Sequence, residues 1–123
     1  MSYENRGEIK PRYSLINLTA LDETSDAFFA GSFSFGSFVL LPDPDEGSGS
    51  LGSATISVEI SVDGENWADP NYPFGPNIYL SGGRPALMQV DLRGVFALRF
   101  KVTKADEDAD PKAQVRAYMQ HMG

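Results

Sequence analysis

The sequence contains no cysteine and only one histidine. The absence of cysteine excludes both a disulfide framework and a thiolate metal site. His121 lies in the short tail after the last apolar pattern, where it is poorly placed to be the buried, oriented base of a Ser-His-Asp or Cys-His arrangement. We therefore expect a protein that is not an enzyme and that needs no cofactor.

The sequence also lacks long apolar runs and an excess of basic residues. No segment approaches the ~20 apolar residues of a membrane helix, and segment 1–8 has neither the basic nor the apolar region of a signal peptide. A formal net charge of −7 opposes long-range attraction to nucleic acid phosphates and to anionic membranes. We expect a soluble protein that is made in the cytoplasm and binds neither nucleic acid nor a membrane.

The rest of the composition is that of a folded domain. Of the 123 residues, 41% are hydrophobic and 11% are aromatic, which excludes wholesale disorder. This length suits one domain with a modest core. Segment 1–12 is polar and contains Gly7 and Pro11, so we interpret it as an N-terminal arm, and 13–120 as a single domain.

The strongest pattern lies between Ser53 and Trp67. Apolar side chains at positions 54, 56, 58, 60 and 62 alternate with polar ones, which is the period of a strand with one face in a core and the other in water. Asp63 and Gly64 form the next turn, because glycine adopts a positive φ without steric cost and aspartate bonds the backbone ahead of it. Trp67 then resumes the apolar pattern, which predicts a β-hairpin.

Similar patterns predict further strands over 13–21, 27–41, 78–80, 86–92, 95–103 and 113–120. With turns roughly every ten residues and no helical period, the chain is predicted to be all-β. We expect an antiparallel β-sandwich or jelly roll of about seven to eight strands.

The aromatic residues are predicted to fill the core, with an exposed sugar-stacking platform as the alternative. In segment 27–41, Phe33 and Phe35 share a face, and a bulge at Gly36 is expected to turn Phe38 back inward. In segment 95–103, the side chains assigned to the core are Phe96, Leu98, Phe100 and Val102.

Two loops and several carboxylates remain as candidates for function. Segment 42–52 is acidic and rich in Gly and Ser, and 68–77 contains three prolines; each is either a harmless insertion or a part that reaches a partner. Glu59 and Asp91 leave a two-carboxylate hydrolase formally open, although acids on strand faces are usually solvated.

A partial calcium-loop pattern occurs at Asp106, Asp108 and Asp110. Pro111 stands where this loop requires glycine, and Ala117 where it requires a bidentate glutamate. No metal site is therefore predicted, although weak cation binding there or at 43–46 stays open.

Two segments resemble small β-sandwich virion structural proteins of tailed bacteriophages. Segment 61–67, SVDGENW, is similar to their strand-turn-Trp hairpin, and segment 90–103, VDLRGVFALRFKVT, is similar to the turn and strand that follow it. The resemblance implies a capsid decoration (cement) protein on the capsid surface of the virion, made in the host cytoplasm. Its implied partners are the major capsid protein and copies of itself, commonly as a trimer.

On this interpretation, the 1–12 arm, the 42–52 loop and the proline-rich 68–77 loop extend over the partners. The candidate contact residues are Tyr3, Arg6, Ile9, Arg12, Tyr72, Phe74 and Tyr79. A neck or tail component of the virion is one alternative. A carbohydrate-binding module is another, because discoidin-like domains share the first motif; its candidate aromatic residues are Trp67, Tyr72, Phe74 and Tyr79.

Overall fold

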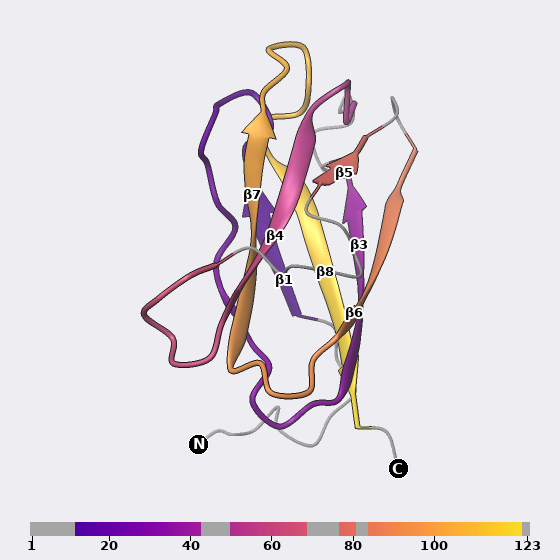
Figure 1. Cartoon of the computed structure of the whole chain (residues 1–123). Helices are drawn as coiled ribbons and strands as arrows, with labels where there is room; N and C mark the ends of the chain where they lie inside the picture. The colour runs from indigo at the N-terminus through magenta and orange to yellow at the C-terminus, as the bar shows by residue number, and fades with distance from the viewer. Residues whose placement is uncertain (1–11, 43–49, 69–76, 81–83, 122–123) are drawn as a thin grey trace, which may run out of the picture.

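The computed structural model describes residues 12–42, 50–68, 77–80 and 84–121. The described residues form eight strands: β1 (Arg12–Ile16), β2 (Phe28–Phe29), β3 (Phe35–Leu41), β4 (Thr55–Ser61), β5 (Asn77–Tyr79), β6 (Ala86–Asp91), β7 (Ala97–Lys104) and β8 (Ala113–Gln120). They make two sheets that pack face to face (Figure 1). Across these ranges the chain contains no helix of the length and apolarity needed to span a membrane.

The strand order identifies the fold. One sheet has the order β1-β8-β3-β6 and the other the order β2-β7-β4-β5, and all the pairings are antiparallel. The pairs β1/β8, β2/β7, β3/β6 and β4/β5 are therefore hydrogen-bonded neighbours, as in one long hairpin rolled into two layers. This is the jelly-roll form of the β-sandwich, and it confirms the predicted fold class.

Three phenylalanine rings meet between the two sheets. Phe28, Phe38 and Phe100 are buried, and their ring centroids lie 5.4 to 6.3 Å apart in tilted or edge-on contacts. Such pairs add stability beyond the area that they bury. For these three residues, the aromatic side chains fill the core as predicted.

The bulge predicted at Gly36 is wrong. Strand β3 pairs residue for residue with β6 and with β8 through this position. Gly36, Phe38 and Leu40 face the core, whereas Phe35 is half-buried on the opposite face. Phe38 thus points inward in a regular strand, and no extra residue is needed to turn it.

Two assignments of side chains to core or solvent are also wrong. Strand β7 begins at Ala97, so Phe96 belongs to the preceding turn and is 41% exposed, while Ala97 is buried. The face of β4 that was expected to lie in water is largely covered, because Thr55, Ser57 and Ser61 are buried.

Candidate interaction surfaces

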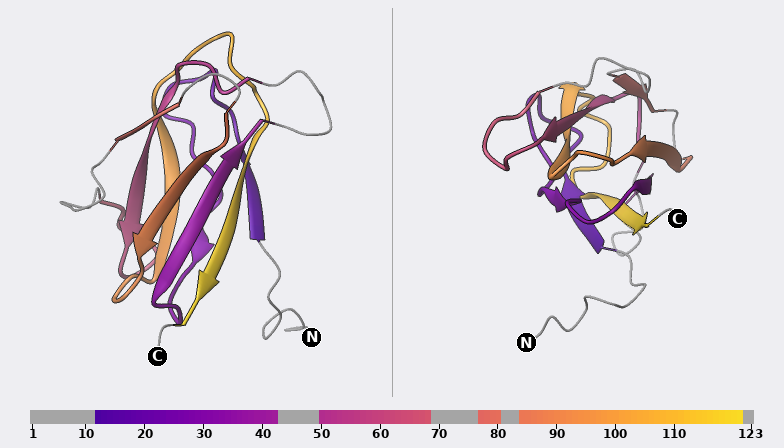
Figure 2. Two further views of the ribbon diagram at one scale, coloured as in Figure 1. Left: turned by 90° about the vertical axis from the view of Figure 1, so that its right-hand side faces the viewer. Right: turned by 60° about the horizontal axis from the view of Figure 1, so that its bottom comes forward.

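The outer face of the β1-β8-β3-β6 sheet carries the largest group of exposed apolar side chains in the described chain. Figure 2, left, shows these four strands side by side. The most exposed are Tyr13 (65%), Leu15 (52%), Leu87 (64%) and Tyr118 (43%). We call the outward side chains of this sheet the apolar face: Tyr13, Leu15, Phe35, Ser37, Val39, Leu41, Leu87, Gln89, Asp91, Gln114, Arg116, Tyr118 and Gln120.

Strand register brings residues of the apolar face together from distant parts of the sequence. Tyr13 is paired with Arg116, Arg116 with Val39, and Val39 with Leu87. These four residues form one row across all four strands, with neighbouring side chains about 5 Å apart. Leu15, Gln114 and Leu41 form the next row. Arg116 and Gln114 on β8 thus separate the apolar side chains of β1 from those of β3 and β6 on the same face.

This face carries little charge on a protein with a net charge of −7. Its charged residues are Arg116, whose Nε donates to Oε1 of Gln114, and Asp91. Large exposed apolar side chains gathered on one face are typical of interaction sites. The apolar face is thus the first candidate for a protein-binding surface.

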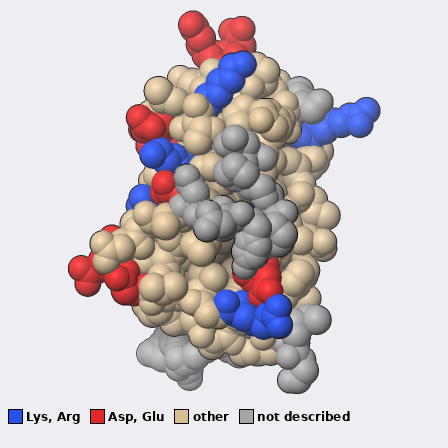
Figure 3. Space-filling model, viewed as in Figure 1, with Lys and Arg blue, Asp and Glu red and all other residues tan. Residues whose placement is uncertain are grey.

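The outer face of the β2-β7-β4-β5 sheet is different, because it holds a group of ion pairs. Nε of Arg99 lies 2.8 Å from Oε1 of Glu59, whose side chain is only 12% exposed. Nζ of Lys101 lies 3.9 Å from Oε2 of Glu59 and 3.6 Å from Oδ1 of Asp22. Figure 3 shows acidic and basic side chains interspersed on this side of the molecule. The two faces of the sandwich therefore differ in chemistry.

Trp67 is held against this charged group. The guanidinium carbon of Arg99 lies 4.2 Å from the centroid of the Trp67 ring, a cation–π contact. Arg99 therefore occupies one face of the Trp67 ring, and that face is closed to a ligand.

The turn after β4 is fixed by the carboxylate of Asp63. Oδ1 accepts hydrogen bonds from the backbone N–H groups of Glu65 and Asn66 at 2.8 and 2.9 Å, and Ser61 Oγ donates to the same oxygen. The backbone N–H groups of Asn66 and Glu65 hold the pKa of the Asp63 carboxyl well below its usual range. Gly64 has a φ of 86°, a conformation that favours glycine.

An exposed aromatic pair lies beside this turn. The rings of Phe29 and Phe96 meet edge-on with centroids 5.0 Å apart, and the two side chains are 47% and 41% exposed. A Cβ at Gly64 would lie 2.9 Å from the Phe96 ring. This pair is a second, smaller patch of exposed apolar surface.

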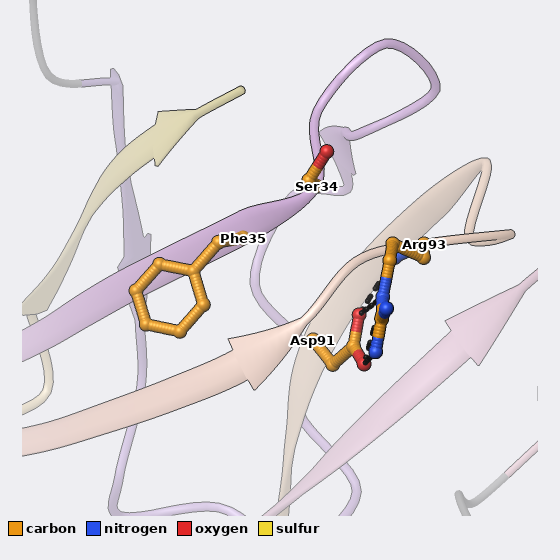
Figure 4. A pocket seen from close by; sticks show the side chains of 4 residues that line it. All are labelled: Ser34, Phe35, Asp91 and Arg93. Carbon is orange, nitrogen blue, oxygen red and sulfur yellow. Dashed lines mark hydrogen bonds and ion pairs between the residues drawn. The ribbon is translucent and has the colours of Figure 1, made fainter. Parts of the chain in front are cut away.

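A shallow depression of about 420 Å³ lies at one end of the apolar face and is lined by Ser34, Phe35, Asp91 and Arg93 (Figure 4). Nε of Arg93 donates to Oδ1 of Asp91 at 2.9 Å, and the backbone N–H of Arg93 donates to the same oxygen. These hydrogen bonds from Arg93 lower the pKa of Asp91 to about 2. At neutral pH this carboxylate is ionised and already hydrogen-bonded.

In the acidic segment after β7, the carboxylate of Asp106 accepts hydrogen bonds from that segment and from the residue Ser53 before β4. Oδ2 of Asp106 accepts hydrogen bonds from the N–H and the hydroxyl of Ser53, and Oδ1 accepts one from the N–H of Asp108. The bonds from Ser53 and then Asp108 hold the pKa of Asp106 below its usual range. Within the described ranges, no group of three or more His, Cys, Asp or Glu side chains is arranged to hold a metal ion.

The comparisons with known proteins find similarity in structure alone. No protein-family model matches the chain, and no curated protein gives a significant match. The structure is similar to the crystal structure of the SPBc2 prophage-derived protein YomS, with a TM-score of 0.57 and 13% sequence identity, covering 89% of this chain and 94% of that one. These two chains share a fold.

A second similar structure is the K1 cleaved adhesin domain of Lys-gingipain from Porphyromonas gingivalis W83. Its TM-score is 0.45 at 12% identity, with 92% of this chain and 75% of that one covered.

The structure separates the contact residues that the sequence suggested. Tyr79 is 74% exposed on β5, at the edge of the β2-β7-β4-β5 sheet. The backbone of Arg12 begins β1, at the edge of the other sheet. The remaining candidates lie outside the described residues: Tyr3, Arg6, Ile9, Tyr72 and Phe74. Most of the suggested loop segments, 43–49 and 69–76, also lie outside them.

Glu59 and Asp91, the two acids considered for a hydrolase, lie in different sheets. Glu59 is on β4 and pairs with Arg99, whereas Asp91 ends β6 and pairs with Arg93. Each carboxylate is thus engaged by its own arginine.

Sequence reasoning missed the apolar face. Alternation already placed Leu87 and Tyr118 on the outward side of their strands. Their location on the same face of one sheet depends on the order in which the strands pair, which the sequence does not display.

Proposed function

We propose that this chain is a structural protein of a tailed-phage virion, and specifically a capsid decoration protein that binds the major capsid protein. The observation that carries the proposal is the apolar face, which gathers exposed apolar side chains on one sheet of an acidic protein and whose charged residues are Arg116 and Asp91. The fold shared with a prophage-derived protein supports the phage assignment. In this role the sandwich is a rigid body that works by burying surface, without chemistry.

The area of the apolar face limits how much surface it can bury in an interface. Four strands about 4.8 Å apart and about seven residues long, at roughly 3.3 Å per residue, cover a plane of about 19 by 23 Å, or ~440 Å². A standard interface takes about 800 Å² from each partner. The face therefore supplies roughly half, and we assign the remainder to adjoining segments such as 1–11, which lead into β1.

Binding to capsid shells that lack the protein tests this proposal. Leu15→Lys and Tyr118→Lys each put a charge on the apolar face, where burial would be costly. We expect them to weaken shell binding by a factor of about 10 or more, measured by co-sedimentation. Leu21→Lys is the matched control, since Leu21 is also an exposed apolar side chain, 59% exposed, but lies outside the apolar face. Normal binding by both face variants would contradict the proposal.

Copy number separates the decoration role from a neck or tail role. Quantitative mass spectrometry of purified virions should find hundreds of copies if the chain covers the shell. About a dozen copies per particle would instead indicate a connector ring, in which the same face would contact other partners.

A further inference from the structure

Strand β6 forms an open edge of the β1-β8-β3-β6 sheet. It forms the border of the molecule on the right of Figure 1 and pairs with β3 on one side only. In the described part of the chain, no backbone hydrogen bond joins its other side to another segment. Edge strands of this kind are templates for pairing with a further strand.

The alternation of hydrogen bonds between β3 and β6 shows which backbone groups of β6 point away from β3, toward the open edge. The N–H of Leu92 donates to the carbonyl of Ser34, and in the register of β3 with β6 these residues are opposite each other. Because bonded and non-bonded pairs alternate in antiparallel sheets, Met88 and Val90 bond to β3. The N–H and C=O groups of Leu87 and Gln89 therefore point away from the sheet.

The other edge strands of the sandwich are shorter than β6. Strands β2 and β5 contain two and three residues. Strand β1 has five residues, and the N–H of Asp26 contacts it at Ser14 by donating to the Oγ of that buried residue. Only β6 combines a length of six residues with an open side among the described strands.

The side chains of β6 do not protect this edge. Natural edges are commonly blunted by lysine, by an internal proline or by a bulge, but positions 86–90 carry no charge and no proline, and the register with β3 is unbroken. Leu87 is also 64% exposed.

We propose that β6 pairs antiparallel with β6 of a second copy of this chain. A register centred on Met88 sets Leu87 opposite Gln89 of the second copy, so the outward groups of both strands form about four hydrogen bonds. The same register places Asp91 of each copy opposite Pro85 of the other, so the two Asp91 carboxylates lie apart. For a chain with a net charge of −7, this uncharged edge is where two copies meet with little repulsion.

The contact is isologous, because the same strand of each copy forms it. It joins the β1-β8-β3-β6 sheets of the two copies into a single sheet that has eight strands. An isologous contact closes at two copies, so the expected species is a dimer. This proposal goes beyond the proposed function, because it concerns the free protein and does not depend on a capsid.

Analytical ultracentrifugation and hydrogen exchange of the full chain test the proposal. We expect a monomer–dimer equilibrium with a dissociation constant on the order of 10–100 μM. The amides of Leu87 and Gln89 should exchange slowly only at high protein concentration. The amides of Met88 and Val90, which bond to β3, should be protected at every concentration and serve as internal controls.

Two variants should shift the equilibrium to monomer by a factor of about 10 or more. Gln89→Pro removes an outward N–H, at an edge position that tolerates proline. Leu87→Lys places two like charges near the two-fold axis and keeps the backbone unchanged. Tyr13→Lys, on the opposite edge of the same face, is the matched control and should dimerise normally.

Three outcomes would overturn the proposal: a monomer at about 1 mM protein, a trimer, or a dimer that both variants leave intact. None of these outcomes bears on shell binding, which Leu15→Lys and Tyr118→Lys test separately.

Discussion

The ring of Phe38 lies against the backbone of Gly36, two residues earlier on the inward face of β3. A Cβ at position 36 would lie 2.8 Å from Cε1 of Phe38 and 3.0 Å from Cδ1 of Leu92. Both neighbours are fully or almost fully buried, so neither can move aside into solvent. Glycine at this position permits a close approach of a core ring to the strand.

Gly36→Ala should therefore destabilise the protein. The methyl group would restrict the unfolded chain, a gain of about 0.4–1 kcal/mol, but overpacking a core costs about 1–3 kcal/mol. We expect a net loss of roughly 1–2 kcal/mol in the free energy of unfolding, measured by urea denaturation. Ser37→Ala, on the opposite face of the same strand, is the control and should change stability by less than about 0.5 kcal/mol. Equal stability of Gly36→Ala and the wild type would refute this packing.

Two phenylalanines four positions apart should respond very differently to truncation. Phe100 is completely buried and contacts Phe28 and Phe38, so Phe100→Ala should cost about 3–5 kcal/mol. Phe96 is 41% exposed and meets Phe29 edge-on, and Phe96→Ala should cost less than about 1 kcal/mol, because much of its ring already contacts water. Urea denaturation of both variants checks this, and similar losses would contradict the exposed position of Phe96.

This contrast shows where sequence reasoning fails. Alternation from Leu98 to Val102 predicts the inward side chains of β7 correctly, because the period of a strand is local. The same alternation also assigns Phe96 to the core, and this assignment is wrong because the strand begins only at Ala97. A turn breaks the alternation, and the pattern alone does not locate that break.

Sequence reasoning missed the apolar face for a different reason. Each strand's outward residues follow from alternation, but Tyr13 and Leu87 share a row only because β8 and β3 lie between their strands. Strand order results from the packing of the whole chain. The sequence therefore predicted the jelly roll as a class and left its candidate site undetected.

Acid should remove the stability that Asp91 contributes. Hydrogen bonds from Arg93 lower the pKa of Asp91 from 3.8 to about 2. A group whose pKa is lower in the folded state contributes stability above its unfolded pKa and loses it as the pH falls through the folded pKa. Asp91→Asn should thus be less stable than the wild type at pH 7, with a difference that shrinks between about pH 5 and pH 2. Urea midpoints across this range measure it, and a difference that grows toward low pH would reverse the assigned sign.

Salt should have little effect on shell binding if the apolar face makes the contact. Arg116 and Asp91 are the charged residues of that face, whereas the opposite side of the sandwich carries the ion pairs around Glu59. Exposed charges are screened over about 8 Å at physiological ionic strength and about 3 Å at 1 M. A charged interface would therefore weaken steeply with NaCl, and an apolar one would not. We expect less than a threefold change, roughly, in the dissociation constant between about 50 and 500 mM NaCl, and a negative heat-capacity change in titration calorimetry. A steep loss of binding with salt would assign the contact to the charged side.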